Sequence, residues 1–196
     1  MKVSREQVAE NRRKILAAAA RLVRKRGFDA VTIDEVTNEA GLTRGAFYGH
    51  FKSKSDLMAQ ACGYAARREG KLEYPSLAYF CSEYLTRRHR EKHGEGCVFA
   101  ATGQEAVRQP IEIRHELTEG FKKRVEHLSR SAPGKTSKEK RSATVTAYST
   151  LVGALVLARM SDDPELSDEL LSVNRDVLLP KLTRHSTNQF TLRDCL

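Results

Sequence analysis

The sequence predicts an all-α protein of about nine helices, and three observations support this fold class. Apolar residues recur three or four positions apart along most of the chain, which is typical of helices with one buried face. Pairs that match a capping box, among them Thr32 with Glu35 and Thr136 with Glu139, mark helix starts. No segment alternates apolar and polar residues over the length of a strand. With 196 residues and 40% hydrophobic composition, the chain can bury a substantial core.

The first helix is expected to begin after Ser4, which matches a capping box with Gln7, and to end at Gly27. Apolar residues lie at helical spacing between these two limits. They include Val8, Ile15, Leu16, Ala19, Leu22 and Val23.

Two short helices are expected next. One begins after Thr32 and ends at Ala40-Gly41, because glycine readily adopts the left-handed conformation at a helix C-terminus. The other runs from Arg44 to about Phe51, and Thr43 can cap it. A helix, a glycine-containing turn and a second short helix form the helix-turn-helix design, whose second helix lies in the major groove of DNA.

The remainder of the chain is predicted to be helical throughout. Ser53 and Asp56 match another capping box, and glycine or proline separates the later periodic segments. The expected helices cover approximately residues 54–69, 77–93, 97–109, 117–128, 137–160 and 166–182.

The run from Thr32 to Leu57 resembles the DNA-binding domain of the TetR family of bacterial transcriptional regulators. Thr37 departs from the family pattern, which usually has alanine there. A threonine methyl fits this space if its hydroxyl bonds back to the helix. The matching residues are Thr32, Val36, Ala40, Gly41, Leu42, Thr43, Gly45, Phe47, Tyr48, His50, Phe51, Lys54 and Leu57.

Residues expected to contact DNA lie on or beside the second short helix. Arg44 can bond a guanine edge, and Tyr48, His50 and Lys54 can donate to phosphates. The starts of the two short helices offer backbone amides to phosphates. The predicted contacts are Thr32, Thr43, Arg44, Gly45, Ala46, Tyr48, His50 and Lys54. Val36 and Phe51 are assigned to the core instead.

The charge distribution agrees with an anionic partner. The net charge is +9, and residues 1–28 contain nine basic residues against two acidic ones. From residue 138 onward, the chain contains eight basic and eight acidic residues.

The resemblance implies a helix-turn-helix DNA-binding domain at residues 1–53 and a helical ligand-binding and dimerisation domain at 54–196.

The last two helices are expected to form a dimer interface. Residues 143–160 are apolar on almost every face, so this helix should be buried on several sides, and Gly153 and Ala154 permit close approach. With the leucine stripe after residue 166, they would form half of an intermolecular four-helix bundle, as in the family. The alternative is an ordinary internal core. The candidate interface residues are Val152, Leu155, Val156, Leu170, Asn174, Val177 and Leu178.

The resemblance also implies a pocket for an unknown small-molecule effector among helices four to eight, with helix four as the link to the DNA-binding domain. Aromatic residues at helical spacing are also typical of plain core packing. The candidate lining residues are Cys62, Phe80, Tyr84, Cys97, Phe99 and Tyr148.

Cys97 has two interpretations. It begins a helix after Gly94-Glu-Gly96, and His89 and His93 lie just upstream, so its thiol pKa could be lowered as in a sensor of electrophiles or oxidants. The other interpretation is buried packing, since free cysteine is among the most buried residues. The same cysteine with either histidine is the only enzyme-like assembly offered, and no third residue orients a base.

The sequence therefore predicts a non-enzymatic, homodimeric regulator of transcription, a repressor that binds a palindromic double-stranded DNA operator and is released from it by a small-molecule effector. A constitutive repressor or architectural protein without a ligand remains the alternative. No metal site, cofactor or membrane partner is expected, and the cysteines should be free thiols. With no signal peptide pattern, and with residues 143–158 shorter than a membrane span, a cytoplasmic location is expected.

Overall fold

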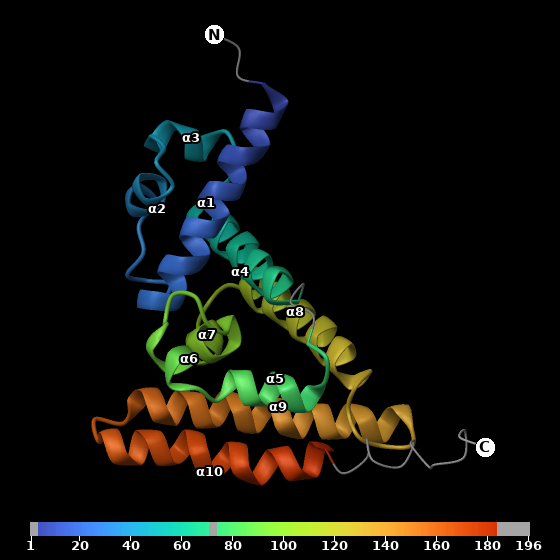
Figure 1. Ribbon diagram of the computed structural model, residues 1–196. Helices are drawn as coiled ribbons and strands as arrows, with labels where there is room; N and C mark the ends of the chain where they lie inside the picture. Colours follow the sequence, from blue (N-terminus) through green and yellow to red (C-terminus); the bar gives the residue numbers. More distant parts are fainter. Residues whose placement is uncertain (1–3, 71–73, 184–196) are drawn as a thin grey trace, which may run out of the picture. The chain divides into compact units, whose positions relative to one another are not determined.

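The computed structural model describes residues 4–70 and 74–183. Every regular element in these two ranges is a helix, which confirms the all-α prediction (Figure 1). The ten helices are α1 (Arg5–Arg26), α2 (Ile33–Glu39), α3 (Arg44–Tyr48), α4 (Lys54–Gly70), α5 (Leu77–Tyr84), α6 (Arg87–Glu91), α7 (Val98–Ala106), α8 (Ile111–Ser129), α9 (Ser137–Met160) and α10 (Pro164–Thr183).

The additional helix arises from a break in the expected fifth helix. Leu85 has φ −89° and ψ 66°, which lie outside helical values, so α5 ends at Tyr84 and α6 begins at Arg87. Other expected starts are confirmed: Ser4 accepts a hydrogen bond from the amide of Gln7, and Thr136 forms a complete capping box with Glu139.

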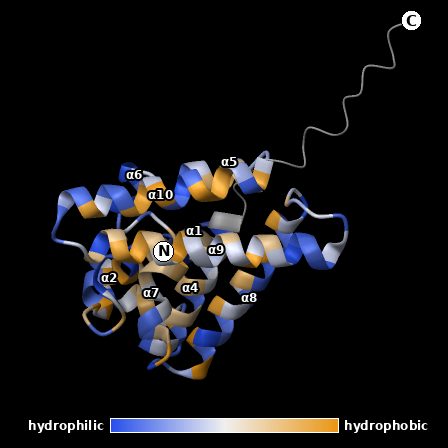
Figure 2. Cartoon of the chain, turned by 90° about the horizontal axis from the view of Figure 1, so that it is seen from below, coloured by the Kyte–Doolittle hydropathy of each residue, from blue (hydrophilic) through white to orange (hydrophobic). Residues whose placement is uncertain are grey.

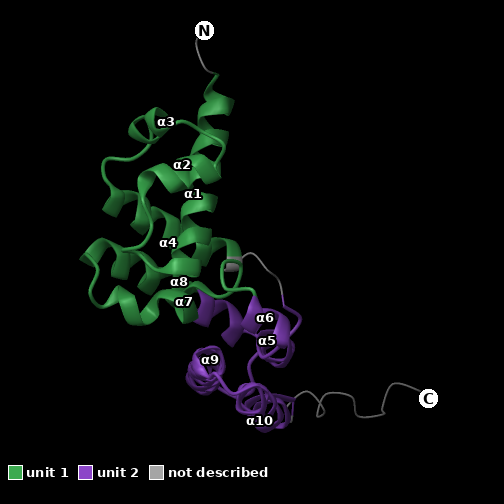
Figure 3. Cartoon of the chain, turned by 90° about the vertical axis from the view of Figure 1, so that its left-hand side faces the viewer, with its two compact units in different colours: residues 1–72, 92–123 green, residues 73–91, 124–196 purple. Residues whose placement is uncertain are grey.

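The chain forms two compact units (Figure 3). Unit 1 comprises residues 1–72 and 92–123, and unit 2 comprises residues 73–91 and 124–196. The division of function expected at residues 53 and 54 remains a prediction. Packing does not divide the chain there, because α4 packs along α1 within unit 1.

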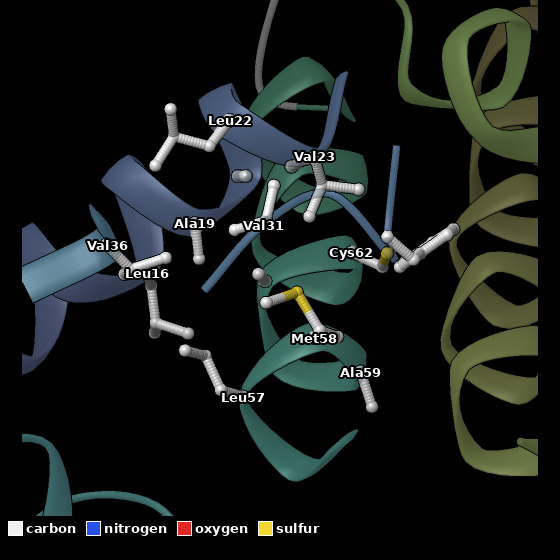
Figure 4. Packing of buried hydrophobic residues seen from close by; sticks show 14 of the residues in the cluster. Leu16, Ala19, Leu22, Val23, Val31, Val36, Leu57, Met58, Ala59 and Cys62 are labelled. Atoms are coloured by element: carbon white, nitrogen blue, oxygen red, sulfur yellow. The ribbon is translucent and has the colours of Figure 1, made fainter. Parts of the chain in front are cut away.

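The core of unit 1 joins the helix-turn-helix to α1 and α4. Figure 4 shows Leu16 and Ala19 of α1 near Val36 of α2, and Leu57 and Met58 of α4 on the other side of the cluster. Val36 is fully buried and Phe51 is 4% exposed, which confirms their assignment to the core. Burial of this many apolar side chains makes the small domain and α4 one packed body.

Unit 2 is built on the antiparallel pair of α9 and α10, which lie side by side (Figure 1). The carboxylate of Asp168 on α10 accepts hydrogen bonds from Arg87 and Arg90 of α6. Arg159 of α9 donates to the backbone carbonyls of His89, at 2.8 Å, and Arg90. These contacts fix the short helix α6 against the helical pair.

Residues 143–158, expected to be too short to span a membrane, lie within a longer helix. They belong to α9, whose 24 residues and mean hydropathy of 1.3 in its most apolar window would allow a span by length and composition. Core helices of soluble proteins meet the same criteria. In unit 2, α9 contacts α5, α6 and α10, as a core helix does.

Candidate nucleic-acid interface

The turn between α2 and α3 is defined by hydrogen bonds at both ends of α2. Thr32 forms a complete capping box with Glu35 at the start. At the end, Gly41 has φ +68°, and the amide of Leu42 donates a 2.9 Å bond to the carbonyl of Thr37. A residue with a side chain would be strained at Gly41. The sequence therefore sets the angle at which α3 leaves α2.

Thr37 is accommodated as its chemistry predicts. Its side chain is fully buried, and its hydroxyl donates to the backbone carbonyls of Ile33 and Asp34, both at 3.1 Å. A buried hydroxyl is costly only when it lacks a hydrogen-bond partner. The departure from the family pattern is thus absorbed within α2.

Helix α3 has one buried side and one exposed side. Phe47 is 1% exposed and stacks on Phe51 at a centroid distance of 5.8 Å. Arg44, Gly45 and Tyr48 are exposed, as is Thr43 just before them, while Ala46 is half-buried. The buried phenylalanines therefore hold α3 so that its polar residues face outward.

Two details of α3 differ from the prediction. Thr43 occupies the N-cap position with extended backbone angles, but its side chain makes no capping hydrogen bond. The helix ends at Tyr48 rather than near Phe51. The amides of His50 and Phe51 still bond to the carbonyl of Phe47, so the chain continues as a turn.

Arg44 is held by neighbours on the same surface. Its Nη1 atom donates a 3.0 Å bond to Oδ2 of Asp34, on α2. A hydrogen bond with Tyr48 and the charge of Asp34 both raise the pKa of Arg44. Nothing in the sequence spacing indicated Asp34, because it lies ten positions before Arg44 and acts across the turn.

His50 and Lys54 are less exposed than Arg44. Burial, followed by the positive charge of Arg12, lowers the pKa of His50, so a neutral imidazole is favoured. The Nζ atom of Lys54 is 3.4 Å from the carbonyl oxygen of Asp29. Both side chains carry N–H donors that can bond a phosphate.

Several basic side chains of α1 form ion pairs within unit 1. Arg26 pairs with Glu35, whose pKa is lowered to about 2 by that bond and by the bonds from Thr32. Arg12 donates to Gln60 and lies over the Phe51 ring at 5.4 Å. These contacts stabilise the domain, so the basic surplus of residues 1–28 is partly structural.

A contact that the sequence did not indicate supports the loop before α2. The amide of Phe28 donates to the Glu105 carboxylate of α7, and Nε of Arg24 donates a 2.8 Å bond to the carbonyl of Gly94. Both contacts lie within unit 1. They tie α7 and its preceding loop to the end of α1, from which the chain enters α2.

The candidate effector residues fall into two groups. In unit 2, Phe80 stacks on Tyr148 with centroids 5.6 Å apart, and Tyr84 contacts both rings edge-on. Arg124, only 2% exposed, places its guanidinium 5.7 Å from the Phe80 ring. The other candidates lie in unit 1, where Phe99 packs against Phe121.

The cysteines are buried. Cys62, Cys81 and Cys97 carry free thiols, and burial raises the pKa of Cys62 and of Cys81 to about 12. Cys97 is 4% exposed at the N-cap of α7 and makes no capping bond with its side chain. Cys195 lies outside the described residues.

The proposed dimer residues also divide by exposure. Val156 and Val177 are 41% and 50% exposed, and Val152, Leu170 and Asn174 are half-buried. Leu155 and Leu178, in contrast, are buried in the packing of the chain itself.

Comparisons with known proteins agree with this geometry. Residues 15–61 match the family model described as bacterial regulatory proteins, tetR family. The chain is 47% identical over 55 residues to the uncharacterized regulator YerO of Bacillus subtilis, and 35% identical over 83 residues to the regulator AcrR of Shigella flexneri. These matches cover 28% and 42% of this chain, and only 19% and 39% of the relatives' length.

Longer matches cover nearly the whole chain at lower identity. An uncharacterized regulator of Mycobacterium tuberculosis is 27% identical, over 89% of this chain and 97% of that protein. The fold is similar to that of a TetR regulator from Legionella pneumophila, with a TM-score of 0.70, 19% identity, and coverage of 93% and 100% of the two chains. Residues 15–61 are therefore similar to the DNA-binding segment of the TetR family of helix-turn-helix transcriptional regulators, and the fold of the chain is similar to that of solved TetR regulators.

Proposed function

We propose that this protein is a homodimeric repressor that binds a palindromic operator through α3 and is released from it by a small-molecule effector. The observation that carries the DNA-binding part is the division of α3 into two sides. Phe47 anchors the helix in the core, while Arg44, Gly45 and Tyr48 face outward. An outward-facing helix after a fixed turn can enter the major groove.

Gly45 supports close approach of this surface to DNA. A Cβ atom added at this position would meet no neighbouring atom nearer than Oγ1 of Thr43, at 3.8 Å. Packing inside the chain therefore does not require glycine here. The absence of a side chain would instead let the backbone of α3 approach a phosphate or a base edge.

Exposed apolar residues on α9 and α10 support the homodimer. Val156, Val173 and Val177 are between 41% and 50% exposed, and a Cβ added at Gly153 would meet open space. Apolar colour recurs along both helices in Figure 2. A five-residue recognition helix reads few base pairs, so two copies related by a two-fold axis would be needed to read a palindrome. Leu155 and Leu178 would support this interface from beneath.

The aromatic cluster of Phe80, Tyr84 and Tyr148 supports an effector site in unit 2. An effector can release DNA only if it binds the DNA-incompetent state more tightly than the competent one. Operator DNA must then weaken effector binding by the same factor.

Repression is the proposed direction of regulation because one relative, BepR of Brucella suis, is named a transcriptional repressor. Burial of Cys97 argues against a thiol sensor.

The decisive experiment is selection of bound duplexes from a random DNA pool, followed by measurement of affinity at two salt concentrations. We expect one enriched motif with two-fold symmetry and half-sites about one helical turn apart. Sedimentation of the complex should give two protein chains per duplex. A pool without any enriched sequence would contradict sequence-specific binding, and an enriched motif without symmetry would contradict the dimer.

A further inference from the structure

We propose that Asp34 is a specificity-determining residue of the DNA-binding surface, because it positions the Arg44 guanidinium for contact with a base. The inference rests on the proposed function, since it requires α3 to read DNA. It assigns a role to an acidic residue on a surface whose partner is an anion, where an unneeded carboxylate would weaken binding.

The contact joins the two helices of the motif. Oδ2 of Asp34, in the first turn of α2, accepts from Nη1 of Arg44, the first residue of α3, at 3.0 Å. Both side chains are more than half exposed, at 55% and 59%. A pair this exposed contributes little to folding, so stability does not account for it.

Capping does not account for Asp34 either. The capping box of α2 is completed by Thr32 and Glu35, and Glu35 also pairs with Arg26. Asp34 is therefore not needed to begin the helix. Its carboxylate is directed across the turn to the residue that leads α3.

The donor inventory of arginine explains how one partner can position it for another. A guanidinium carries five N–H donors in a rigid plane; Asp34 accepts from Nη1, and Tyr48 forms a hydrogen bond with the same guanidinium. The remaining donors can bond O6 and N7 of a guanine as a bidentate pair. An arginine held in one orientation loses less freedom when it meets a base than one that samples many rotamers.

Asp34 also opposes contacts that carry no sequence information. Its negative charge repels phosphates, so Arg44 is less able to turn onto the DNA backbone without losing its partner. A repulsive group of this kind raises specificity by weakening the wrong complexes. Removal of Asp34 should therefore strengthen non-specific binding while weakening discrimination at one base pair.

The test compares Asp34→Ala and Asp34→Asn with Glu39→Gln, a control on the same helix. Glu39 pairs with Arg21 instead of Arg44, so this control removes one negative charge from α2 and leaves the Arg44 contact intact. For each variant, affinity is measured for the selected operator, for operators with single base changes, and for unrelated DNA. Thermal unfolding of each variant establishes that it is folded.

We expect Asp34→Ala to lower the ratio of specific to non-specific affinity by about fivefold to tenfold, with the loss confined to one base pair of each half-site. Asp34→Asn keeps an acceptor oxygen without the charge, so its effect should be smaller. In an Arg44→Ala background, Asp34→Ala should change base discrimination no further, because it acts through Arg44.

Two results would overturn the inference while leaving the proposed function intact. One is that Asp34→Ala raises affinity for all sequences alike, by the same factor as Glu39→Gln. Asp34 would then affect DNA binding only through its negative charge. The other is a tighter operator complex with an unchanged specificity ratio, which would make Asp34 a competitor for Arg44. If wild-type protein selects no motif, the proposed function fails and the inference fails with it.

Discussion

The backbone amide of Phe28 donates a 2.9 Å hydrogen bond to the carboxylate of Glu105, a residue 77 positions further along the chain. Phe28 begins the loop that leads from α1 into the helix-turn-helix, whereas Glu105 lies on α7. Gly27 beside it has φ +82°, and a Cβ there would come within 2.4 Å of a Glu105 oxygen. The Glu105 carboxylate can therefore reach the amide of Phe28 only because the preceding residue, Gly27, has no side chain.

Glu105→Ala should lower the free energy of unfolding by roughly 1–3 kcal/mol, because the part-buried amide of Phe28 loses its acceptor. Chemical denaturation measures the loss. Glu105→Gln is the matched control, since its side-chain carbonyl can still accept the bond, and it should recover most of the stability. Equal loss in both variants would show that the negative charge of Glu105, and not the hydrogen bond, stabilises the loop.

Arg44→Ala should relax sequence preference at one base pair of each half-site, costing roughly 1–3 kcal/mol of discrimination if Arg44 contacts guanine. Lys54→Ala should weaken binding to all sequences alike and reduce the salt dependence, as expected for a phosphate contact. Tyr48→Phe removes a phosphate donor and also the hydrogen bond with Arg44, so it should weaken binding to all sequences and in addition relax preference at the Arg44 base pair. A selected motif unchanged by Arg44→Ala would make Arg44 another phosphate contact.

The local chemistry of the motif could be predicted from the sequence because it depends on neighbours within four residues. The capping box of Thr32, the positive φ of Gly41 and the buried hydroxyl of Thr37 are all of this kind. Side-chain spacing also identified the buried positions Val36 and Phe51.

Contacts between distant segments could not be predicted in this way. Asp34 reaches Arg44 across a turn, and Glu105 reaches Phe28 from another helix, so no local spacing marks either pair. The break between α5 and α6 is accompanied by contacts of Arg87 and Arg90 with Asp168 on α10, which lies 81 and 78 positions further along the chain. The exposure of individual apolar residues could not be predicted either, since Leu155 is fully buried whereas Val156 and Leu157 of the same helix are 41% and 45% exposed.

Val177→Glu should convert the proposed dimer into folded monomers. Val177 is 50% exposed in the single chain, so a carboxylate there is solvated in the monomer and desolvated only in the interface. Sedimentation at micromolar concentration measures the change. Leu155→Glu is the contrasting variant, because Leu155 is fully buried within the chain and its replacement should unfold the protein. A monomeric wild-type protein would exclude the dimer.

Thiol labelling should distinguish burial from sensing. In the native protein, Cys62 and Cys81 should resist alkylation at neutral pH, because burial raises both pKa values to about 12 and little thiolate is present. Cys97 should resist as well, since only 4% of it is exposed. All three should react after addition of denaturant. Rapid native labelling of Cys97, with loss of DNA binding that Cys97→Ser prevents, would support the electrophile sensor.

His89 should make the stability of the protein depend on pH near neutrality. Its Nδ1 lies 2.8 Å from the carbonyl oxygen of Tyr84, and its ring packs edge-on against the Tyr84 ring at 4.5 Å. Burial lowers the pKa of His89 below 6.5, the bond to Tyr84 opposes this, and the charge of Arg159 adds to it.

The direction follows from proton binding in the two states. Between the folded pKa and 6.5, the unfolded chain binds more protons at His89 than the folded protein does. The His89 contribution is therefore complete above that window, declines as pH falls through it, and is constant below the folded pKa. The carboxyl of Asp168, whose pKa lies below 3.8, acts in a separate and more acidic range. Denaturation between about pH 7.5 and 5.5 should show a decline in wild type that is reduced in His89→Asn, which cannot titrate. An equal decline in both proteins would assign the dependence to another group.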